Sequence, residues 1–375
     1  MPQPRVIVIG AGLGGLLVGK ILSGKGCAVT LLEQGAQPGG ALQTFVRGGI
    51  RFDTGFHAVG GLGPGEPLEQ LFRPLGLMEL PWLRMEPDEL IGCDEAFLRL
   101  SSGREEEKAH VLTPYSQSVW RLAGGGKTLV DALAAGQRIL LRKRVTALED
   151  RCVHCADGSQ YQADLIVSDI HPLSTMRMVR DRFRPAYLHR LEKLENGPGI
   201  FTVYVKLKPG VLPYCNHAIF LEDRLMIHFG EAASDGSARS IDLLAFETPD
   251  QVRGDERRVR GDGRRVRGDE RRVWGDETGP DRASRALALI QIAAGRFPGL
   301  SAAVEQYWTS TPATWERYTG TPGGSAYGIR KCGPQDYLAP QTPLPWLYLT
   351  GQNIGLHGVL GTAVSALNTC KTIAL

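Results

Sequence analysis

A glycine-rich turn near the N-terminus carries the clearest chemical signal in the sequence. It begins at Gly10 and reads G-A-G-L-G-G. In this pattern Gly10 permits a tight turn, Gly12 lets the backbone approach a pyrophosphate, and Gly15 lets a helix pack closely on a sheet. The helix would start at Leu13 and Gly14, and its free N–H groups and positive dipole end would face the phosphates. The motif therefore predicts a dinucleotide-binding turn.

An acidic residue at a suitable distance strengthens this interpretation. Glu33 follows Gly10 by 23 residues, close to the spacing of about 20 at which a carboxylate binds the adenosine ribose. An acid suits free ribose hydroxyls and repels a 2′-phosphate. Gln34, next to it, belongs to the same predicted site. Whether the dinucleotide is FAD or NAD depends on the next stretch, in which Gly39 and Gly40 follow closely.

The elements that must position this turn form a β-α-β unit. Residues 5–9 are a continuous apolar run, residues 13–22 have helical apolar spacing, and residues 28–32 form a second apolar run. Such runs are typical of strands buried on both faces of a parallel sheet, and their connection should be right-handed. Residues 164–168 and 346–350 predict two further buried strands.

A second sheet is predicted in the middle of the chain. Its strands are expected at residues 201–208, 218–221, 225–228 and 241–246. Residues 138–156 alternate in polarity, which predicts antiparallel strands joined by a turn. Helices are expected at residues 128–135, 282–295 and 358–372.

Composition argues against several classes of function. The net charge of +3 is too small for a nucleic-acid-binding surface. No run of about 18 apolar residues exists, so no transmembrane helix is predicted. The first strand starts at Arg5, and we expect no signal peptide before it. Seven cysteines at irregular spacing are typical of reduced thiols in the cytoplasm.

No metal site is expected from the sequence. Cys152 and Cys155 have C-x-x-C spacing, but positions three apart in a strand point to opposite faces, so the two thiols cannot hold one ion. His57 follows a predicted strand and could orient a substrate or move a proton, with a hydrogen-bonded structural role as the alternative. His357 leaves the same two interpretations open.

Seven longer segments follow one another along nearly the whole chain. They read V-I-V-I-G-A-G-L-G-G-L, L-L-E-Q-G-A-Q-P-G-G-A, F-D-T-G-F-H-A-V-G-G, A-G-G-G-K-T-L-V-D-A-L, A-D-L-I-V-S-D-I-H-P, T-P-A-T-W-E-R-Y-T-G-T-P-G-G-S-A-Y-G and L-Y-L-T-G-Q-N-I-G-L-H-G-V-L-G-T-A. Together they resemble the FAD-dependent oxidoreductases related to phytoene desaturases, carotenoid isomerases and retinol saturases, within the amine-oxidase-like flavoprotein group. The third and sixth segments favour the retinol-saturase-like and carotenoid-isomerase-like branch.

The resemblance implies FAD as the cofactor and assigns further residues to it. By that resemblance, Gly39, Gly40 and the adjoining Ala41 approach the ribityl chain and the phosphates. The backbone of Val145 would meet the adenine end.

The C-terminal segment is expected, by the same resemblance, to wrap the flavin. Gly351 would pass near the pyrophosphate, and Val359 and Leu360 would present N–H groups to the N1/O2 edge of the flavin. A helix that starts near residue 358 would stabilise negative charge on reduced flavin through its positive end. A well-packed strand-turn-helix without a ligand is the alternative, although its many glycines indicate a close approach to another group.

The expected fold is α/β, with a Rossmann-type FAD-binding domain and an inserted α+β substrate domain on an antiparallel sheet. The FAD-binding domain is expected to be discontinuous, with segments at residues 1–75, 121–175 and 326–375. The substrate domain would then comprise residues 76–120 and 176–325.

The chain departs from the family pattern at three places. The stretch between residues 90 and 120 is shorter than expected. A seven-residue repeat, V-R-G-D-E-R-R, fills residues 252–277; it has too few apolar residues to build a core and predicts a disordered insertion over residues 251–279. Gln352 stands where many relatives carry an acid. The substrate half is therefore expected to be reduced, which puts its activity in question.

The expected function is that of an FAD-dependent oxidoreductase acting on carbon–carbon bonds of an apolar isoprenoid such as a carotenoid or retinoid. Saturation, desaturation and isomerisation remain open, and the electron acceptor is unknown. The alternatives are a flavin amine oxidase-like enzyme, a non-catalytic or decayed FAD-binding paralogue, and an NAD-dependent dehydrogenase, which the glycine-rich C-terminal segment disfavours. A cytoplasmic location is expected, with peripheral membrane contact as an open alternative and no nucleic-acid partner.

Overall fold

The computed structural model of the chain describes residues 3–85, 118–179, 182–221, 225–247 and 280–373. The repeat at residues 252–277 and most of the shortened stretch at residues 90–120 lie outside the described residues. Within the described part, no helix is both long and apolar enough to cross a membrane.

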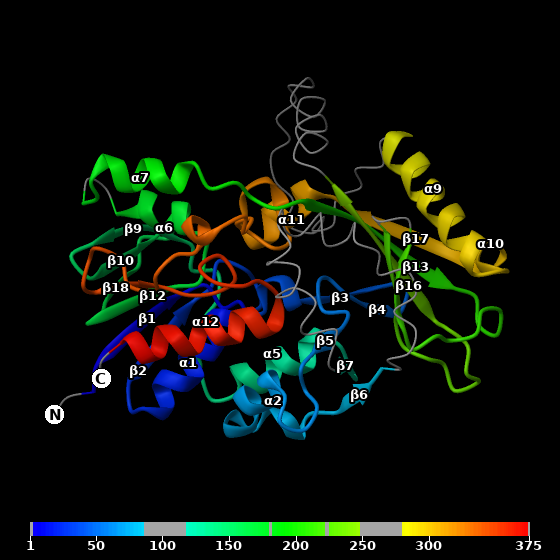
Figure 1. Cartoon of the computed structure of the whole chain (residues 1–375), viewed down its shortest axis with the longest axis horizontal. Coiled ribbons are helices and arrows are strands. Elements are labelled where there is room, and N and C mark those ends of the chain that lie inside the picture. The colour runs from blue at the N-terminus through cyan, green and yellow to red at the C-terminus, as the bar shows by residue number, and fades with distance from the viewer. Residues whose placement is uncertain (1–2, 86–117, 180–181, 222–224, 248–279, 374–375) are drawn as a thin grey trace.

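A five-stranded parallel sheet forms the centre of one half of the molecule (Figure 1). Its strand order is β18-β12-β1-β2-β8, so segments far apart in the sequence lie side by side. The α/β fold class is thereby confirmed. The strands are β1 (Arg5–Ile9), β2 (Ala28–Leu32), β8 (Arg138–Leu140), β12 (Leu165–Ser168) and β18 (Leu347–Leu349).

The prediction for the start of the 138–156 segment was wrong. β8 pairs with β2 in parallel and forms the edge of the main sheet. The strand is only three residues long, with Arg138 exposed and the two apolar residues half-buried, so its own side chains give no sign of its direction. The antiparallel part follows, as a three-stranded sheet in the order β11-β10-β9. Its strands are β9 (Val145–Glu149), β10 (Cys152–Cys155) and β11 (Gln160–Gln162).

Layers of other elements cover both faces of the parallel sheet. Val6 and Val8 of β1 contribute to a core with three helices on one face, whereas Ile7 and Ile9 contribute to a core on the other face. This alternation explains why β1 is apolar at successive positions. The first face carries α1 (Leu13–Gly24), α5 (Gly126–Ala134) and α12 (Gly358–Thr372). The second carries α6 (Pro172–Met178), α7 (Pro185–Glu192) and the small sheet of β9 to β11.

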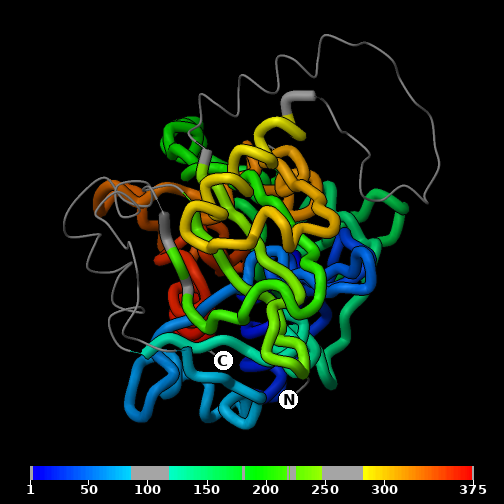
Figure 2. The backbone as a smooth tube through the Cα atoms, turned by 90° about the vertical axis from the view of Figure 1, so that its right-hand side faces the viewer, coloured from blue at the N-terminus to red at the C-terminus, as the bar shows by residue number. Residues whose placement is uncertain are grey.

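A five-stranded antiparallel sheet forms the other half, in the order β14-β15-β16-β13-β17. Helices α9 and α10 pack on its outer face, where α9 lies in front of the strands in Figure 2. The inner face is turned towards the parallel sheet. The bounds are β13 (Gly199–Leu207), β14 (Ala218–Leu221), β15 (Leu225–Phe229), β16 (Ser240–Glu247), β17 (Val304–Ser310), α9 (Pro280–Arg296) and α10 (Leu300–Ala303).

Short elements connect the two halves. A hairpin of β3 and β4 lies between them in Figure 1, and a small sheet in the order β5-β7-β6 lies below it. Helix α11 begins with a capping box at Thr311. The bounds are β3 (Thr44–Arg47), β4 (Ile50–Asp53), β5 (Val59–Gly60), β6 (Trp82–Arg84), β7 (Val119–Leu122), α2 (Pro67–Phe72) and α11 (Pro312–Thr319).

Candidate cofactor and substrate site

A cavity of about 400 Å³ lies between the two large sheets. Ile9 and Leu32 line it from the carboxyl ends of β1 and β2, and Asp169 lines it from just beyond β12. Residues on the inner face of the antiparallel sheet close it from the other side. The carboxyl edge of a parallel sheet is the usual place for a dinucleotide in folds of this class.

The glycine-rich turn forms one wall of the cavity. Gly10 has a φ of +93°, which favours glycine. A Cβ on Gly14 would lie 2.9 Å from the Cα of Gly351, and one on Gly15 would overlap the carbonyl oxygen of Gly10. Larger residues would therefore push the turn apart. Gly12 is the N-cap of α1 and has no side chain to cap the helix; of the first N–H groups, that of Gly15 donates to the carboxyl group of Asp169.

Glu33 lies beside this turn, as its spacing of 23 residues from Gly10 predicts. Its two carboxylate oxygens accept hydrogen bonds from the N–H of Ala11, at 2.9 Å, and of Gly35, at 2.7 Å. A carboxylate can accept about four hydrogen bonds, so capacity remains for ribose hydroxyls. Glu33 and Gln34 both line the cavity.

Asp169 is a residue that sequence reasoning missed. Its Oδ2 lies 2.8 Å from the place where a Cβ on Gly12 would be, and its Oδ1 faces Gly14. Burial raises the pKa of Asp169 to about 7, nearby Glu33 adds to the rise, and the Gly15 N–H opposes it. The carboxyl group therefore lies at the N-terminus of α1, where a phosphate would bind. The one available signal was its position at the end of a buried strand next to β1.

The N-terminus of the C-terminal helix also lies at the cavity, as a second helix N-terminus beside that of α1. Helix α12 starts at Gly358, with His357 as its N-cap and no acidic residue in its first turn. Val359 and Leu360 line the cavity, whereas Gly351 packs behind the lining against Gly14 and Asp169. Gln352 stands where the family resemblance leads us to expect an acidic residue. Its side-chain amide donates a hydrogen bond of 3.2 Å to the carbonyl oxygen of Ala326.

The remaining predicted cofactor residues are distributed around the same cavity. Gly39, Gly40, Ala41 and Val145 line it. A Cβ on Gly40 would lie 3.3 Å from the Cα of Gly12, so the second glycine pair packs against the first motif. Of all the predicted residues, Gly15 and Gly351 alone do not border the cavity, and both support the backbone that does.

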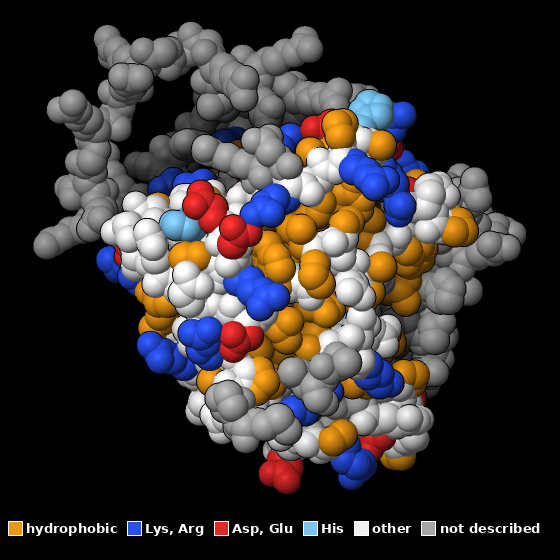
Figure 3. All heavy atoms as spheres, turned by 90° about the vertical axis from the view of Figure 1, so that its left-hand side faces the viewer, with side chains coloured by type: hydrophobic (Ala, Val, Ile, Leu, Met, Phe, Trp, Pro, Cys, Tyr) orange, Lys and Arg blue, Asp and Glu red, His pale blue; other side chains and the backbone are white. Residues whose placement is uncertain are grey.

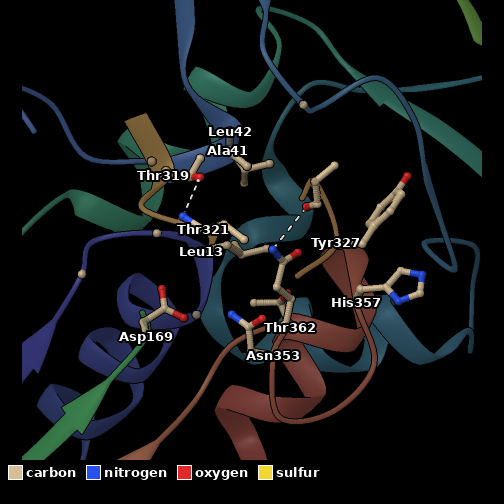
Figure 4. Close-up of a pocket in the computed structure, with 18 of the residues that line it drawn as sticks. Leu13, Ala41, Leu42, Asp169, Thr319, Thr321, Tyr327, Asn353, His357 and Thr362 are labelled. Carbon is tan, nitrogen blue, oxygen red and sulfur yellow. Dashed lines mark hydrogen bonds between the residues drawn. The ribbon is translucent and has the colours of Figure 1, made fainter. Parts of the chain in front are cut away.

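The end of the cavity far from the glycine-rich turn is largely apolar. Figure 4 shows Tyr327 and His357 across the cavity from Asp169. The rings of Phe246 and Tyr327 are stacked with centroids 6.3 Å apart, and the ring of His357 lies 4.7 Å from that of Tyr327. Burial raises the pKa of Tyr327 to about 12 and, together with the charge of Lys331, lowers the pKa of His357 to about 4.

His57 lies at the boundary between this cavity and a second, smaller one. Its ring is 6% exposed, and its centroid lies 4.9 Å from that of His228. Burial, and the neighbouring ring of His228, lower the pKa of His57 well below its ordinary value. The side chain is therefore neutral at physiological pH and suits hydrogen bonding or metal ligation better than charge stabilisation.

Comparison with protein families connects this geometry to a known group. A profile described as "NAD(P)-binding Rossmann-like domain" matches residues 8–75, and one described as "Flavin containing amine oxidoreductase" matches residues 78–212. These matches support an FAD-dependent, amine-oxidase-like family for the chain. The predicted resemblance and the predicted cofactor, FAD, are both confirmed.

Individual relatives match in short segments. The chain is 35% identical over 112 residues to all-trans-retinol 13,14-reductase of Macaca fascicularis. This alignment covers 28% of this chain and 18% of that enzyme. It is 47% identical over 51 residues to a neurosporene-forming phytoene desaturase of Rhodobacter capsulatus, covering 14% and 10% respectively. The chain thus spans less than a fifth of either relative in these alignments.

Similarity of fold extends much further than similarity of sequence. The solved structure of cyclohexylamine oxidase from Brevibacterium oxydans superposes with a TM-score of 0.63 at 14% identity, covering 99% of this chain and all of the other. At this identity the match establishes the fold alone.

The residues at the cavity fit FAD. The N-terminus of α1, the glycines of the turn and Glu33 line the same cavity, and the carboxyl group of Asp169 lies where a pyrophosphate would approach the turn. The N-terminus of α12 lies further along the same cavity. When bound, FAD supplies hydride or electron chemistry, and the protein supplies position and electrostatics.

Proposed function

We propose that this protein is an FAD-dependent oxidoreductase that acts on a carbon–carbon bond of an apolar isoprenoid, such as a carotenoid or retinoid. The observation that carries the proposal is the apolar inner face of the antiparallel sheet. Ile200, Met226, Leu244 and Phe246 line the cavity there and form one hydrophobic cluster with Tyr327 as a partly buried neighbour.

The register of the sheet explains how these side chains meet. Met226 of β15 and Leu244 of β16 are cross-strand partners, and Ile200 of β13 pairs with Phe246 of β16. Directly opposite residues present their side chains on one face. The wall therefore offers a continuous apolar surface, which would bind a hydrocarbon and leave a charged substrate without partners.

The residues of the chain would contribute position and polarity more than acid–base chemistry. The N–H groups at Val359 and Leu360, at the positive end of α12, are placed to stabilise negative charge on a reduced cofactor. His57 borders the same cavity and would orient a bound substrate or exchange a proton with it in its neutral form. These assignments for the three residues are part of the proposal.

An amine oxidase-like activity is the second candidate. The stacked rings of Phe246 and Tyr327 favour it, since an aromatic pair at the substrate end could hold an amine. Among the described residues that line the cavity, Asp169 and Glu33 are the acids, and both lie at the glycine-rich end. A cationic amine would therefore find aromatic faces but no carboxylate at the substrate end.

The first measurement is the visible spectrum of the purified protein, followed by chromatography of the compound that heat releases. Released FAD then justifies anaerobic assays with retinoids, carotenoids and a panel of amines. Turnover of a polyene supports the proposal, and turnover of amines alone favours the second candidate. Full FAD content without turnover of either class would make the protein a non-catalytic flavoprotein.

A pair of matched variants links the activity to the apolar wall. Met226→Gln places an amide in the cavity, and we expect it to lower turnover of the polyene about tenfold with FAD content unchanged. Leu287→Gln makes the same kind of change on the outer side of α9, where Leu287 is 49% exposed, and should have no effect. Equal activity of both variants would contradict a role for this wall in substrate binding.

A further inference from the structure

Three buried polar residues meet at the small cavity behind the candidate site. His57 comes from the loop between β4 and β5, His228 from β15 and Asp242 from β16. The exposed fractions of these residues are 6%, 4% and 2%. One donor atom from each lies within 4.8 Å of the others.

The fold explains this meeting. His228 and Asp242 are direct cross-strand partners in the antiparallel sheet, so they share a face. Oδ2 of Asp242 lies 3.8 Å from Nδ1 of His228 and 4.0 Å from Nδ1 of His57. The sheet thus holds two of the groups in register and His57 is brought to them by a different part of the chain.

Most polar side-chain atoms of the three residues lack a hydrogen bond of ordinary geometry, although the backbone of His57 lies close enough to the ring of His228 to affect its pKa. Within the described part of the chain, both ring nitrogens of His57, both ring nitrogens of His228, and Oδ1 of Asp242 lack a hydrogen-bond partner. Buried polar atoms are nearly always paired, so a group of five such atoms on three adjacent side chains calls for a shared ligand. The small cavity that they line has a volume of about 20 Å³, which is enough for one ion or one water molecule.

We propose that His57, His228 and Asp242 bind a divalent transition-metal cation, such as Zn²⁺ or Fe²⁺. Two imidazoles and one carboxylate form a ligand set that both metals accept. Metal–ligand bonds of about 2.1 Å place tetrahedral donor atoms about 3.4 Å apart. Donor atoms that now lie within 4.8 Å of one another would therefore have to approach by up to about 1.4 Å. Rotation of the side chains within the cavity can supply this movement.

Charged side chains of both signs surround the small cavity. Five charged side chains line the small cavity, and two of them, Arg51 and Glu231, form an ion pair with each other. The carboxylates of Asp53 and Asp242 then face the single guanidinium of Arg121, which is held by backbone carbonyls and a tyrosine hydroxyl. Burial raises the pKa of Asp53 to about 7 and the pKa of Asp242 well above its ordinary value, so a bound cation would displace the proton of Asp242.

Such a metal would link the two halves of the molecule at the back of the candidate site. His57 lines both cavities, as does its neighbour Phe56, so the ion would fix a side chain that borders the substrate space and the antiparallel sheet at once. This inference does not depend on the proposed substrate, because it rests on the small cavity and predicts a property of the protein before any turnover.

The test is metal analysis of the full-length protein with its FAD. The protein is stripped with a chelator, incubated with Zn²⁺, desalted, and analysed for metal by mass spectrometry and for FAD by absorbance. We expect about one retained Zn²⁺ per chain. Co²⁺ in its place should give d–d bands without a thiolate charge-transfer band, and the chelator should lower the melting temperature.

Two conservative variants locate the site. His228→Gln and Asp242→Asn should each reduce retained metal at least about tenfold, with FAD content preserved and the melting temperature no longer sensitive to the chelator. Two controls should retain the metal: His189→Gln on the surface of α7, and the double variant Cys152→Ser with Cys155→Ser, which removes the other candidate ligands. Circular dichroism verifies that each variant is folded.

The wild-type protein decides the outcome even if a variant fails to fold. If the intact holoprotein retains none of Zn²⁺, Co²⁺ or Fe²⁺, the proposal is overturned and a water molecule is the occupant. Metal that is retained equally by His228→Gln, or lost from the cysteine variant, places the ion elsewhere and overturns the proposal as well.

Discussion

The carboxyl group of Asp169 makes FAD binding dependent on pH. It occupies the N-terminus of α1, beside Gly12 and Gly14, where the pyrophosphate would bind. Burial and the nearby Glu33 raise its pKa from 3.8 to about 7. A neutral Asp169 is compatible with a phosphate, whereas an ionised one repels it and competes for the same N–H groups. FAD should therefore bind to the form in which Asp169 is protonated.

The magnitude follows from the pKa. With a pKa of about 7, half of the molecules carry the proton at pH 7 and about one in a hundred carries it at pH 9, so the apparent Kd for FAD should rise about 50-fold between these values. This change corresponds to about 2.3 kcal/mol. Below pH 6 the proton is present in nearly all molecules, and the Kd should be constant.

Without FAD, the same group makes the folded protein less stable at high pH. Because the folded-state pKa is raised, ionisation opposes folding increasingly as the pH rises from about 4 to 7, and the full cost is present above pH 7. A shift of about three pKa units corresponds to about 4 kcal/mol. Asp169→Asn should recover much of this free energy at pH 8 and nothing near pH 4, as measured by urea denaturation of the apoprotein.

The assay is quenching of FAD fluorescence by apoprotein between pH 6 and 9, at constant ionic strength. Asp169→Asn should bind FAD with a Kd that changes less than about threefold over this range. Asp53→Asn is the matched control, because burial also raises the pKa of Asp53 to about 7, yet it lies outside the large cavity and hydrogen-bonds the N–H of Gly126. The reasoning is refuted if the wild-type Kd is flat, or if Asp169→Asn keeps the wild-type slope.

Three further predictions test other parts of the structure. Gly14→Ala should weaken FAD binding by about tenfold or more, because the added Cβ would meet Asp169 and Gly351. Gly24→Ala is the control, because the space at its Cβ position is open, and it should leave the Kd for FAD unchanged. Equal Kd values for the two variants would contradict the close-approach argument. Arg121→Met should lower the free energy of unfolding by about 3 kcal/mol, because it leaves buried carbonyl oxygens without a donor; urea denaturation measures this, and a loss below about 1 kcal/mol would be inconsistent with it. The face shown in Figure 3 has hydrophobic side chains across its middle and Lys and Arg around them, so we expect the protein to float with anionic liposomes, and full recovery in the soluble fraction would count against membrane contact.

Local patterns in the sequence were enough to predict the FAD-binding framework. The glycine-rich turn, the apolar runs of β1 and β2, and the helix that begins at Gly358 depend on neighbours within a few residues or on burial from both sides. Strand β8 shows where this reasoning fails. Its three residues are one arginine and two apolar residues, which give no sign of direction, and only the long-range pairing with β2 reveals that the strand is parallel.

The residues that matter most for the new inferences lie beyond the reach of local patterns. Burial raises the pKa of Asp169, because the fold places it against the turn at Gly12 and Gly14, which is far away in the sequence. His228 and Asp242 look like two polar interruptions in apolar strands, and their pairing follows from register alone. His57 joins them because its loop lies against the antiparallel sheet. A buried polar residue in an apolar strand costs free energy unless it finds a partner, so such interruptions are the positions at which sequence reasoning should look for a ligand.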